Sequence, residues 1–261
     1  MSILSTTIQL ALEPGGVATL TLVPGAPGKP PTLDHATLRE IDARLDELER
    51  RAAEVRLLIV TSAVEKYFCV GANVSALREN DVHNIGEWVR AGHRVFNRLE
   101  SLPFPSIARV TGYALGGGLE LAMACDFIHA TVDAKLGQTE ARLGFVSGWG
   151  GAWRLPRRVG LTRAKELFFT ARVLGAAEAA QIGLVDRVVP DVAVLDAGLV
   201  AFVAEVAANA SVAIAQQKRL LVRCAEGTRA DSAAAEASAA AAVLAEPDTK
   251  RRLSAFLSRG K

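Results

Sequence analysis

The chain of 261 residues has only three cysteines, Cys69, Cys125 and Cys224, and they lie far apart in the sequence. This odd number and wide spacing argue against a disulfide framework and against a metal site built on paired cysteines. The scarcity of cysteine therefore favours a reducing compartment, and we expect a cytoplasmic protein.

An excess of one charge is also missing, because 30 Lys and Arg residues stand against 28 Asp and Glu residues. Proteins that bind nucleic acid or anionic membranes usually carry a clear basic excess. No apolar run reaches the ~20 residues that span a bilayer. The first basic residue is Lys29, which argues against a signal peptide. We expect a globular protein with neither nucleic acid nor a membrane as its partner.

Strand-like and helix-like patterns alternate through about residue 190. Val17–Val23 and Leu57–Thr61 are short and rich in β-branched residues, which predicts strands. Leu33–Arg56 and Val82–Leu99 carry apolar residues at helical spacing, which predicts amphipathic helices. This alternation of strand and helix indicates an α/β fold.

Beyond Asp191 the strand patterns disappear. Val192–Ala208, Val212–Cys224 and Ala233–Ala245 are all predicted to be helices. The last of them is rich in alanine, which favours helix strongly but offers little side chain to bury. We therefore divide the chain into an α/β core over 1–190 and a helical region over 191–261, and expect the helical region to pack against another subunit.

The segment Gly112–Asp126 carries the clearest chemical signal. Three consecutive glycines, Gly116 to Gly118, lead into an apolar helical segment with Glu120 in its first turn. Glycine lets a ligand atom approach the backbone, and the first N–H groups of a helix have no partner within it. A carboxylate in a first helical turn is also common for purely structural reasons.

Two other segments resemble the first in composition. One combines glycines with a glutamate, and the other combines a glycine with small residues. Gly137–Gly151 contains Glu140 and a second cluster of glycines. Phe68–Ala72, with the sequence FCVGA, follows a predicted strand and offers another backbone N–H in a tight turn. Together the three segments suggest a site where negative charge develops on one atom while a proton moves nearby.

These segments resemble the crotonase superfamily, the enoyl-CoA hydratases and isomerases of fatty acid metabolism. The resemblance rests on FCVGAN at 68–73, GYALGGGLELAMACD at 112–126, GQTEARLGFVSGWGGAWRLPRRVG at 137–160 and, more weakly, the stretch 170–190. It implies a spiral of β-β-α units followed by helices that build trimers, often paired into hexamers. It also implies a coenzyme A thioester as substrate and no cofactor, since coenzyme A is part of the substrate.

The resemblance also implies roles for individual residues. The backbone N–H groups of Ala72 and Gly117 would form an oxyanion hole for the thioester oxygen as it becomes an enolate. Glu120 and Glu140 match the two glutamates of the hydratase branch, where one handles the attacking water and the other the α-proton. Gly148 would help to hold that water with its N–H group.

Substrate contacts are implied for Phe68, Trp88 and Trp149, with the tryptophans forming walls of the acyl pocket, although a tryptophan is more often an ordinary core residue. Lys29 lies where the family approaches the nucleotide end of coenzyme A, although a solvated loop lysine is equally plausible. The chain departs from the family pattern at Asn73 and Thr139, and in the loops 31–33 and 147–152. These two loops would contact the nucleotide and the acyl group.

The two glutamates favour reversible hydration of a 2-enoyl-CoA, that is, a hydro-lyase. Isomerisation, thioester hydrolysis or decarboxylation would use the same enolate site with a different set of acids and bases. A non-catalytic acyl-CoA-binding subunit would need neither glutamate. An RNA-binding role would call for a basic helix face, but the charges of 39–56 alternate in sign.

Overall fold

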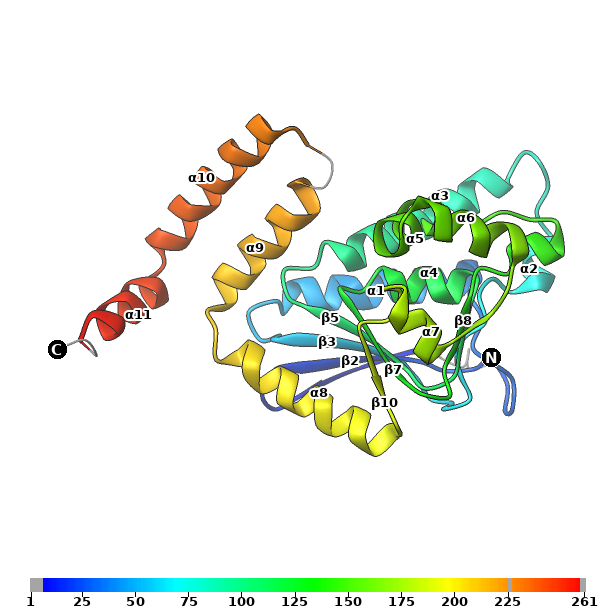
Figure 1. The fold of residues 1–261 in the computed structure, drawn as a ribbon, viewed down its shortest axis with the longest axis horizontal. Coiled ribbons are helices and arrows are strands. Elements are labelled where there is room, and N and C mark those ends of the chain that lie inside the picture. Colours follow the sequence, from blue (N-terminus) through cyan, green and yellow to red (C-terminus); the bar gives the residue numbers. More distant parts are fainter. Residues whose placement is uncertain (1–6, 225–226, 259–261) are drawn as a thin grey trace, which may run out of the picture.

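Two sheets form the framework of the protein in the computed structural model, which describes residues 7–224 and 227–258 (Figure 1). The larger sheet has the order β1-β2-β3-β5-β7-β10, and the smaller has the order β4-β6-β8-β9. The strands are β1 (Ile8–Glu13), β2 (Val17–Leu22), β3 (Leu57–Ser62), β4 (Tyr67–Cys69), β5 (Ser106–Val110), β6 (Tyr113–Leu115), β7 (Phe127–Thr131), β8 (Lys135–Gly137), β9 (Leu174–Gly175) and β10 (Arg187–Val189).

Helices connect the strands, and the described part of the chain after β10 consists of helices joined by short loops. They are α1 (His35–Arg50), α2 (Val74–Arg78), α3 (Ile85–Glu100), α4 (Gly117–Met123), the 3₁₀ turn η1 (Glu140–Leu143), α5 (Gly151–Val159), α6 (Leu161–Thr170), α7 (Ala176–Gln181), α8 (Val192–Ala207), α9 (Ser211–Cys224), α10 (Arg229–Ala245) and α11 (Pro247–Ser258).

The chain alternates between the two sheets in a repeated β-β-α pattern. β3 enters the large sheet and β4 the small one, before α2 and α3. β5 and β6 repeat this before α4, and β7 and β8 repeat it before η1 and α5. Successive repeats pair in parallel in both sheets. The predicted α/β fold with its spiral of β-β-α units is therefore confirmed.

Helix α1 is shorter than the segment that the sequence pattern predicted. It begins after Asp34, whose carboxylate accepts from the Thr37 N–H at 2.8 Å and so caps the helix. Leu33 is instead bound to the turn after β4, because its N–H donates to the Gly71 carbonyl and its carbonyl accepts from Asn73. The helix ends at Arg50, ahead of a turn that leads into β3.

The first two C-terminal helices are attached to the core. Phe202 of α8 meets Phe127 of β7 edge-on, with ring centroids 5.4 Å apart. On α9, the Lys218 Nζ donates to the Asp126 carboxylate at 2.7 Å and to the Phe104 carbonyl at 3.0 Å. Among the described residues no single helix is long and apolar enough to cross a bilayer, and α8 with α9, bent by 102°, passes that test only as a pair.

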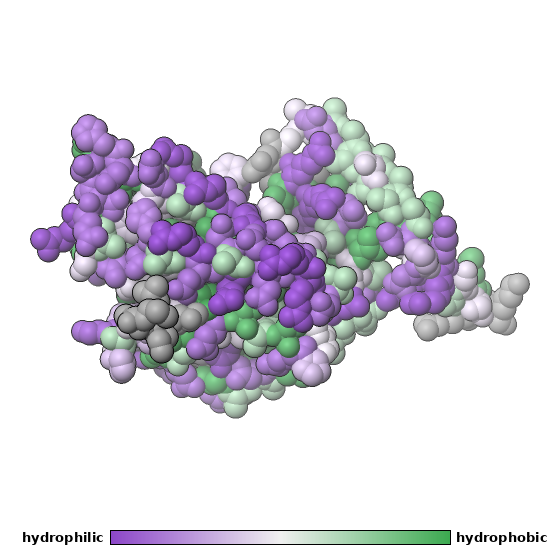
Figure 2. Space-filling view, turned by 180° about the vertical axis from the view of Figure 1, so that it is seen from behind, coloured by the Kyte–Doolittle hydropathy of each residue, from purple (hydrophilic) through white to green (hydrophobic). Residues whose placement is uncertain are grey.

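The last two helices project away from the body of the protein. α10 packs on α9, and α11 continues from it towards the C-terminus (Figure 1). The reverse view shows pale green, weakly apolar surface over this region (Figure 2). Its larger apolar side chains are exposed, namely Leu244, Leu253, Phe256 and Leu257.

Candidate active site

The three segments singled out in the sequence meet at one edge of the small sheet. β4, β6 and β8 are parallel neighbours, so their carboxyl ends lie at the same edge. Ala72 follows β4, Gly117 and Glu120 follow β6, and Glu140 follows β8. Ligands of open α/β sheets generally bind at this edge. The topology thus brings together residues that are up to 68 positions apart, from Ala72 to Glu140.

Two backbone N–H groups approach each other where the first two segments meet. Gly71 has φ +90°, and a Cβ on it would lie 2.9 Å from the Gly117 nitrogen. A Cβ on Gly117 would lie 3.6 Å from the Ala72 nitrogen. Within residues 7–224 and 227–258, neither the Ala72 N–H nor the Gly117 N–H donates to a protein acceptor. Both donors therefore remain free for an oxygen of a ligand.

Glu120 is almost completely buried, and its carboxylate is fixed by a neighbouring loop. Oε1 accepts from the backbone N–H of Trp149 at 2.9 Å and from that of Gly151 at 2.6 Å. Burial raises the pKa of Glu120, while these N–H groups and the charge of Arg154 act against that rise. The bonds within hydrogen-bond distance go to Oε1, and the Gly148 N–H acts on the carboxylate more weakly, so Oε2 can still accept from a ligand or a water.

Glu140 lies above the first glycine of the triplet. A Cβ on Gly116 would be 3.2 Å from Glu140 Oε1, a close approach, and the φ of +52° at Gly116 favours glycine there. Burial and, next, the charge of Glu120 raise the pKa of Glu140 to about 7. Glu120 has two N–H donors and Arg154 to stabilise its charge, and that charge in turn raises the pKa of Glu140, so Glu140 is the member of the pair that more readily holds a proton.

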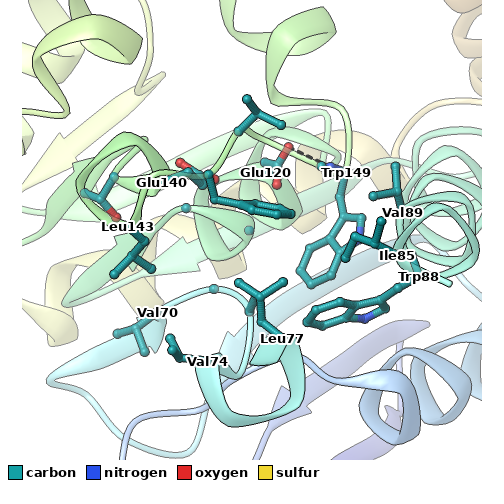
Figure 3. A pocket seen from close by; sticks show the side chains of 18 residues that line it. Val70, Val74, Leu77, Ile85, Trp88, Val89, Glu120, Glu140, Leu143 and Trp149 are labelled. Atoms are coloured by element: carbon teal, nitrogen blue, oxygen red, sulfur yellow. Dashed lines mark hydrogen bonds between the residues drawn. The ribbon is translucent and has the colours of Figure 1, made fainter. Parts of the chain in front are cut away.

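An apolar pocket opens beside the two glutamates (Figure 3). Trp88 and Trp149 lie on one side of it, with their rings edge to face at 72° and 5.4 Å between centroids. Aliphatic side chains from α2, α3 and η1 line the rest: Val74, Leu77, Ile85, Val89 and Leu143. The site therefore combines two carboxyls and two free N–H groups with a surface suited to a hydrocarbon chain.

The sequence was compared with protein families and with proteins of known function, and the matches are to enzymes of one family. A sequence model described as enoyl-CoA hydratase/isomerase matches residues 13–261. The chain belongs to the enoyl-CoA hydratase/isomerase family. It is 36% identical over 247 residues to the short-chain-enoyl-CoA hydratase of Clostridium acetobutylicum, covering 95% of this chain and 93% of that protein. It is 38% identical over 238 residues to the crotonyl-CoA hydratase of Syntrophomonas wolfei, covering 88% and 87%.

Solved structures of the family share the whole fold. An enoyl-CoA hydratase from Bacillus anthracis superposes with a TM-score of 0.89 at 32% identity, covering 97% of each chain. An enoyl-CoA hydratase from Geobacillus kaustophilus superposes with a TM-score of 0.91 at 28% identity, covering 98% of this chain and 95% of the other. The β-β-α core and the C-terminal helices are therefore those of the family.

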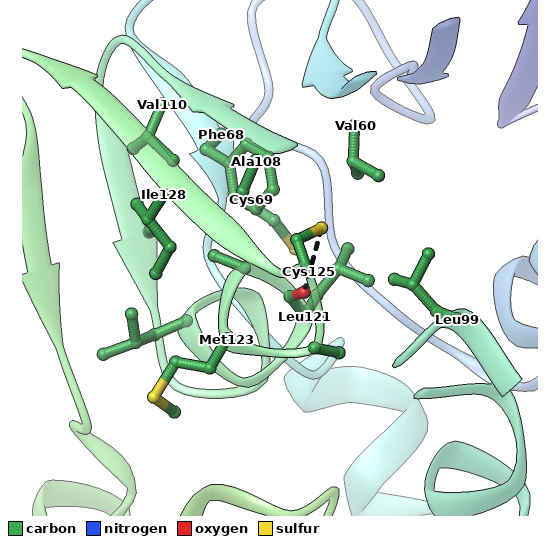
Figure 4. Close-up of a cluster of buried hydrophobic side chains, with 14 of the residues drawn as sticks. Val60, Phe68, Cys69, Leu99, Ala108, Val110, Leu121, Met123, Cys125 and Ile128 are labelled. Atoms are coloured by element: carbon green, nitrogen blue, oxygen red, sulfur yellow. Dashed lines mark hydrogen bonds between the residues drawn. The ribbon is translucent and has the colours of Figure 1, made fainter. Parts of the chain in front are cut away.

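One predicted substrate contact does not reach the pocket of this family member. Phe68 is 1% exposed and packs in the core between the sheets, together with Cys69 and Val110 (Figure 4). Its position in β4 explains this, because both Phe68 and the next residue, Cys69, are buried, so the two faces of this short strand are covered by the core. Cys69 is also buried, and burial raises the pKa of its thiol to about 12, so it is not a nucleophile.

The other predicted contacts have different surroundings. Lys29 is exposed in the loop before α1 and does not line the pocket. The same loop is attached to the turn after β4, because the Val70 N–H donates to the Pro31 carbonyl at 3.1 Å. Gly148 lines the pocket. The short hydrogen bonds to Glu120 come from Trp149 and Gly151, and the Gly148 N–H also acts on that carboxylate to lower its pKa.

Two residues beside the enoyl-CoA hydratase site were not found from the sequence. Arg154 is 3% exposed and donates to the Trp149 carbonyl at 3.1 Å and to Glu100 of α3 at 2.7 Å, so it ties the loop that holds Glu120 to a helix. In the amide orientation that its surroundings favour, the Gln138 nitrogen lies 3.0 Å from Glu140 Oε1. No group of His, Cys, Asp and Glu suited to a metal ion occurs among the described residues.

Proposed function

We propose that this protein reversibly adds water to the α,β double bond of a 2-enoyl-CoA. One observation carries the proposal: two carboxyls, those of the buried Glu120 and the half-buried Glu140, lie beside a pair of free backbone N–H groups. Hydration needs a base for water, an acid for the α-carbon and donors for the thioester oxygen. The arrangement supplies all three, and the apolar pocket would take the acyl chain.

In the proposed step, the Glu120 carboxylate takes a proton from water as the water oxygen bonds to the β-carbon. The π electrons move towards the thioester oxygen, which receives hydrogen bonds from the N–H groups of Ala72 and Gly117. Fixed donors of this kind contribute about 3 kcal/mol each to such reactions. Glu140 then gives its proton to the α-carbon. The pair ends with the proton on Glu120, and exchange with solvent restores the starting state.

The thioester accepts the electrons of this reaction, so we propose that no cofactor takes part and that coenzyme A enters only as part of the substrate. Lys29 would lie near its nucleotide end. The first test is purified protein with but-2-enoyl-CoA. We expect loss of the conjugated absorbance and a product heavier by one water. A product of unchanged mass would indicate isomerisation, and release of free coenzyme A would indicate thioester hydrolysis. Either result would overturn the proposed hydration.

We also propose that the protein assembles as a trimer or a dimer of trimers through its C-terminal helices. The support is that α10 and α11 leave the core with Leu253, Phe256 and Leu257 at least half exposed. Apolar side chains gathered on a projecting element commonly mark an interface. We expect sedimentation of the 27.6 kDa chain at micromolar concentration to give a mass of three or six subunits.

Replacing Phe256 by Glu should shift the assembly towards smaller species, because a charge buried in an apolar interface is costly. Val82→Glu is the matched control, since Val82 is 86% exposed on the loop before α3, and should leave the assembly unchanged. A wild-type protein that sediments as a monomer would contradict the proposed assembly.

A further inference from the structure

Trp149 forms a rigid wall of the pocket. Its side chain is 4% exposed, and its Nε1 donates to the Trp88 carbonyl at 3.3 Å. Behind it, Phe96 meets the indole edge-on at 74° with centroids 5.9 Å apart. The ring therefore has a fixed orientation, with Phe96 packed on one side and the pocket on the other (Figure 3).

The indole occupies a slot between two glycines on different helices. A Cβ on Gly92, in the middle of α3, would lie 2.0 Å from Trp149 Cδ1 and 2.3 Å from its Nε1. A Cβ on Gly117 would lie 2.5 Å from its Cζ3. Glycine in the interior of a helix lowers the stability of that helix. The helix propensity of α3 therefore does not explain why residue 92 is glycine. The glycine is explained by the space that the indole takes up.

The backbone of Trp149 prevents the wall from moving aside. The Trp149 N–H holds Glu120 Oε1 at 2.9 Å, and the Trp149 carbonyl accepts from Arg154 at 3.1 Å. A long ligand that displaced the residue would lose the contact that positions the carboxylate. A smaller motion of the ring alone is limited by Gly92, where even a Cβ would lie 2.0 Å from the ring, and by Phe96, which packs edge-on against it.

We propose that Trp149, in the slot provided by Gly92, limits the substrate to short acyl chains of about four to six carbons. This inference rests on the proposed function, in which the thioester oxygen lies at the Gly117 N–H. The benzo edge of the indole lies against that same glycine. Carbons beyond the reacting double bond would therefore run against the ring as they leave the two glutamates, which would disfavour a chain of ten carbons.

The test compares kcat/KM for 2-enoyl-CoAs of four, six, eight and ten carbons. We expect wild type to favour four carbons over ten by about 100-fold or more, because one misplaced methylene can cost about tenfold. Trp149→Ala should reduce that ratio at least tenfold, and Trp149→Phe should give an intermediate ratio. All these variants retain the backbone N–H that holds Glu120. The phenylalanine variant keeps an aromatic core residue should the alanine variant fail to fold.

Trp153 provides the matched control, because it is a tryptophan four residues further on that is 39% exposed and does not line the pocket. Trp153→Ala should leave the chain-length profile unchanged. Gly92→Ala should lower turnover of every chain length, because its Cβ would push the indole into the pocket. The double variant Gly92→Ala with Trp149→Ala should recover turnover.

Binding of saturated acyl-CoAs, measured by calorimetry, tests the length limit without any chemistry. We expect wild type to bind butanoyl-CoA more tightly than decanoyl-CoA, and Trp149→Ala to gain at least tenfold in affinity for decanoyl-CoA. A protein that shows this pattern but hydrates nothing would refute the proposed function and retain the length limit. A wild type that hydrates or binds ten carbons as well as four would refute the length limit alone.

Discussion

Glu120→Gln is expected to lower kcat for hydration by roughly 10³-fold, the usual contribution of a positioned acid or base. The amide oxygen can still accept from the N–H groups of Trp149 and Gly151, which now bind Oε1 at 2.9 and 2.6 Å. The loop should therefore stay in place, while the group that takes the proton from water is lost. Steady-state kinetics with but-2-enoyl-CoA measures the effect.

The same variant should bind butanoyl-CoA with nearly unchanged affinity and should melt at about the wild-type temperature. Glu87→Gln is the matched control, because Glu87 is an exposed glutamate on α3 that does not line the pocket, and it should be as active as wild type. Turnover by Glu120→Gln close to that of wild type would show that another group activates the water.

The fold was largely predictable from the sequence because its elements are marked by local patterns. The β-branched run Leu57–Thr61 became β3, and the apolar spacing within Val82–Leu99 became α3. The strands of the small sheet were not predicted. β6 and β8 have three residues each, which is too short for the alternating apolar pattern of a strand to be recognised. They form strands because of the neighbouring strands with which they pair rather than because of their own sequence. The sheet edge that carries the site depends on these short strands.

The candidate site was predictable where chemistry needs a particular residue, and not where packing decides. Glycines with Glu120 and Glu140 gave a chemical pattern that the topology then brought to one place. The sequence did not show that Phe68 is buried away from the pocket, because a three-residue strand has no recognisable pattern of burial. Arg154 was missed because an arginine after a glycine cluster is usually solvated, and only its contacts with Trp149 and Glu100 distinguish it.

The loop from Gly148 to Gly151 links chemistry with substrate choice. Its backbone holds Glu120, its tryptophan side chain closes the pocket, and Arg154 ties it to α3. Because the Glu120 contacts are made by backbone N–H groups, the side chain at position 149 is free to vary without disturbing the carboxylate. If Trp149 limits the acyl chain as proposed, this separation would let the acyl preference of the site change while its reaction is retained.

Glu140→Gln should also lower hydration roughly 10³-fold and should in addition change the pH profile. Burial and the charge of Glu120 raise the pKa of Glu140 to about 7, so its carboxyl is protonated below that pH and ionised above it. The reaction needs one proton on the pair of glutamates. The wild-type kcat/KM should therefore fall tenfold per pH unit above about pH 7, and the residual activity of Glu140→Gln should lack this fall.

Dehydration of the 3-hydroxyacyl-CoA provides an internal check. Dehydration starts with the proton on Glu120 and with Glu140 ionised, so the two glutamates again carry one proton in total. Because hydration neither consumes nor releases a proton overall, the ratio of kcat/KM in the two directions must be independent of pH. Both directions should therefore lose activity along the same alkaline limb. A wild-type hydration profile that stays flat to pH 9 would mean that Glu140 does not supply the proton.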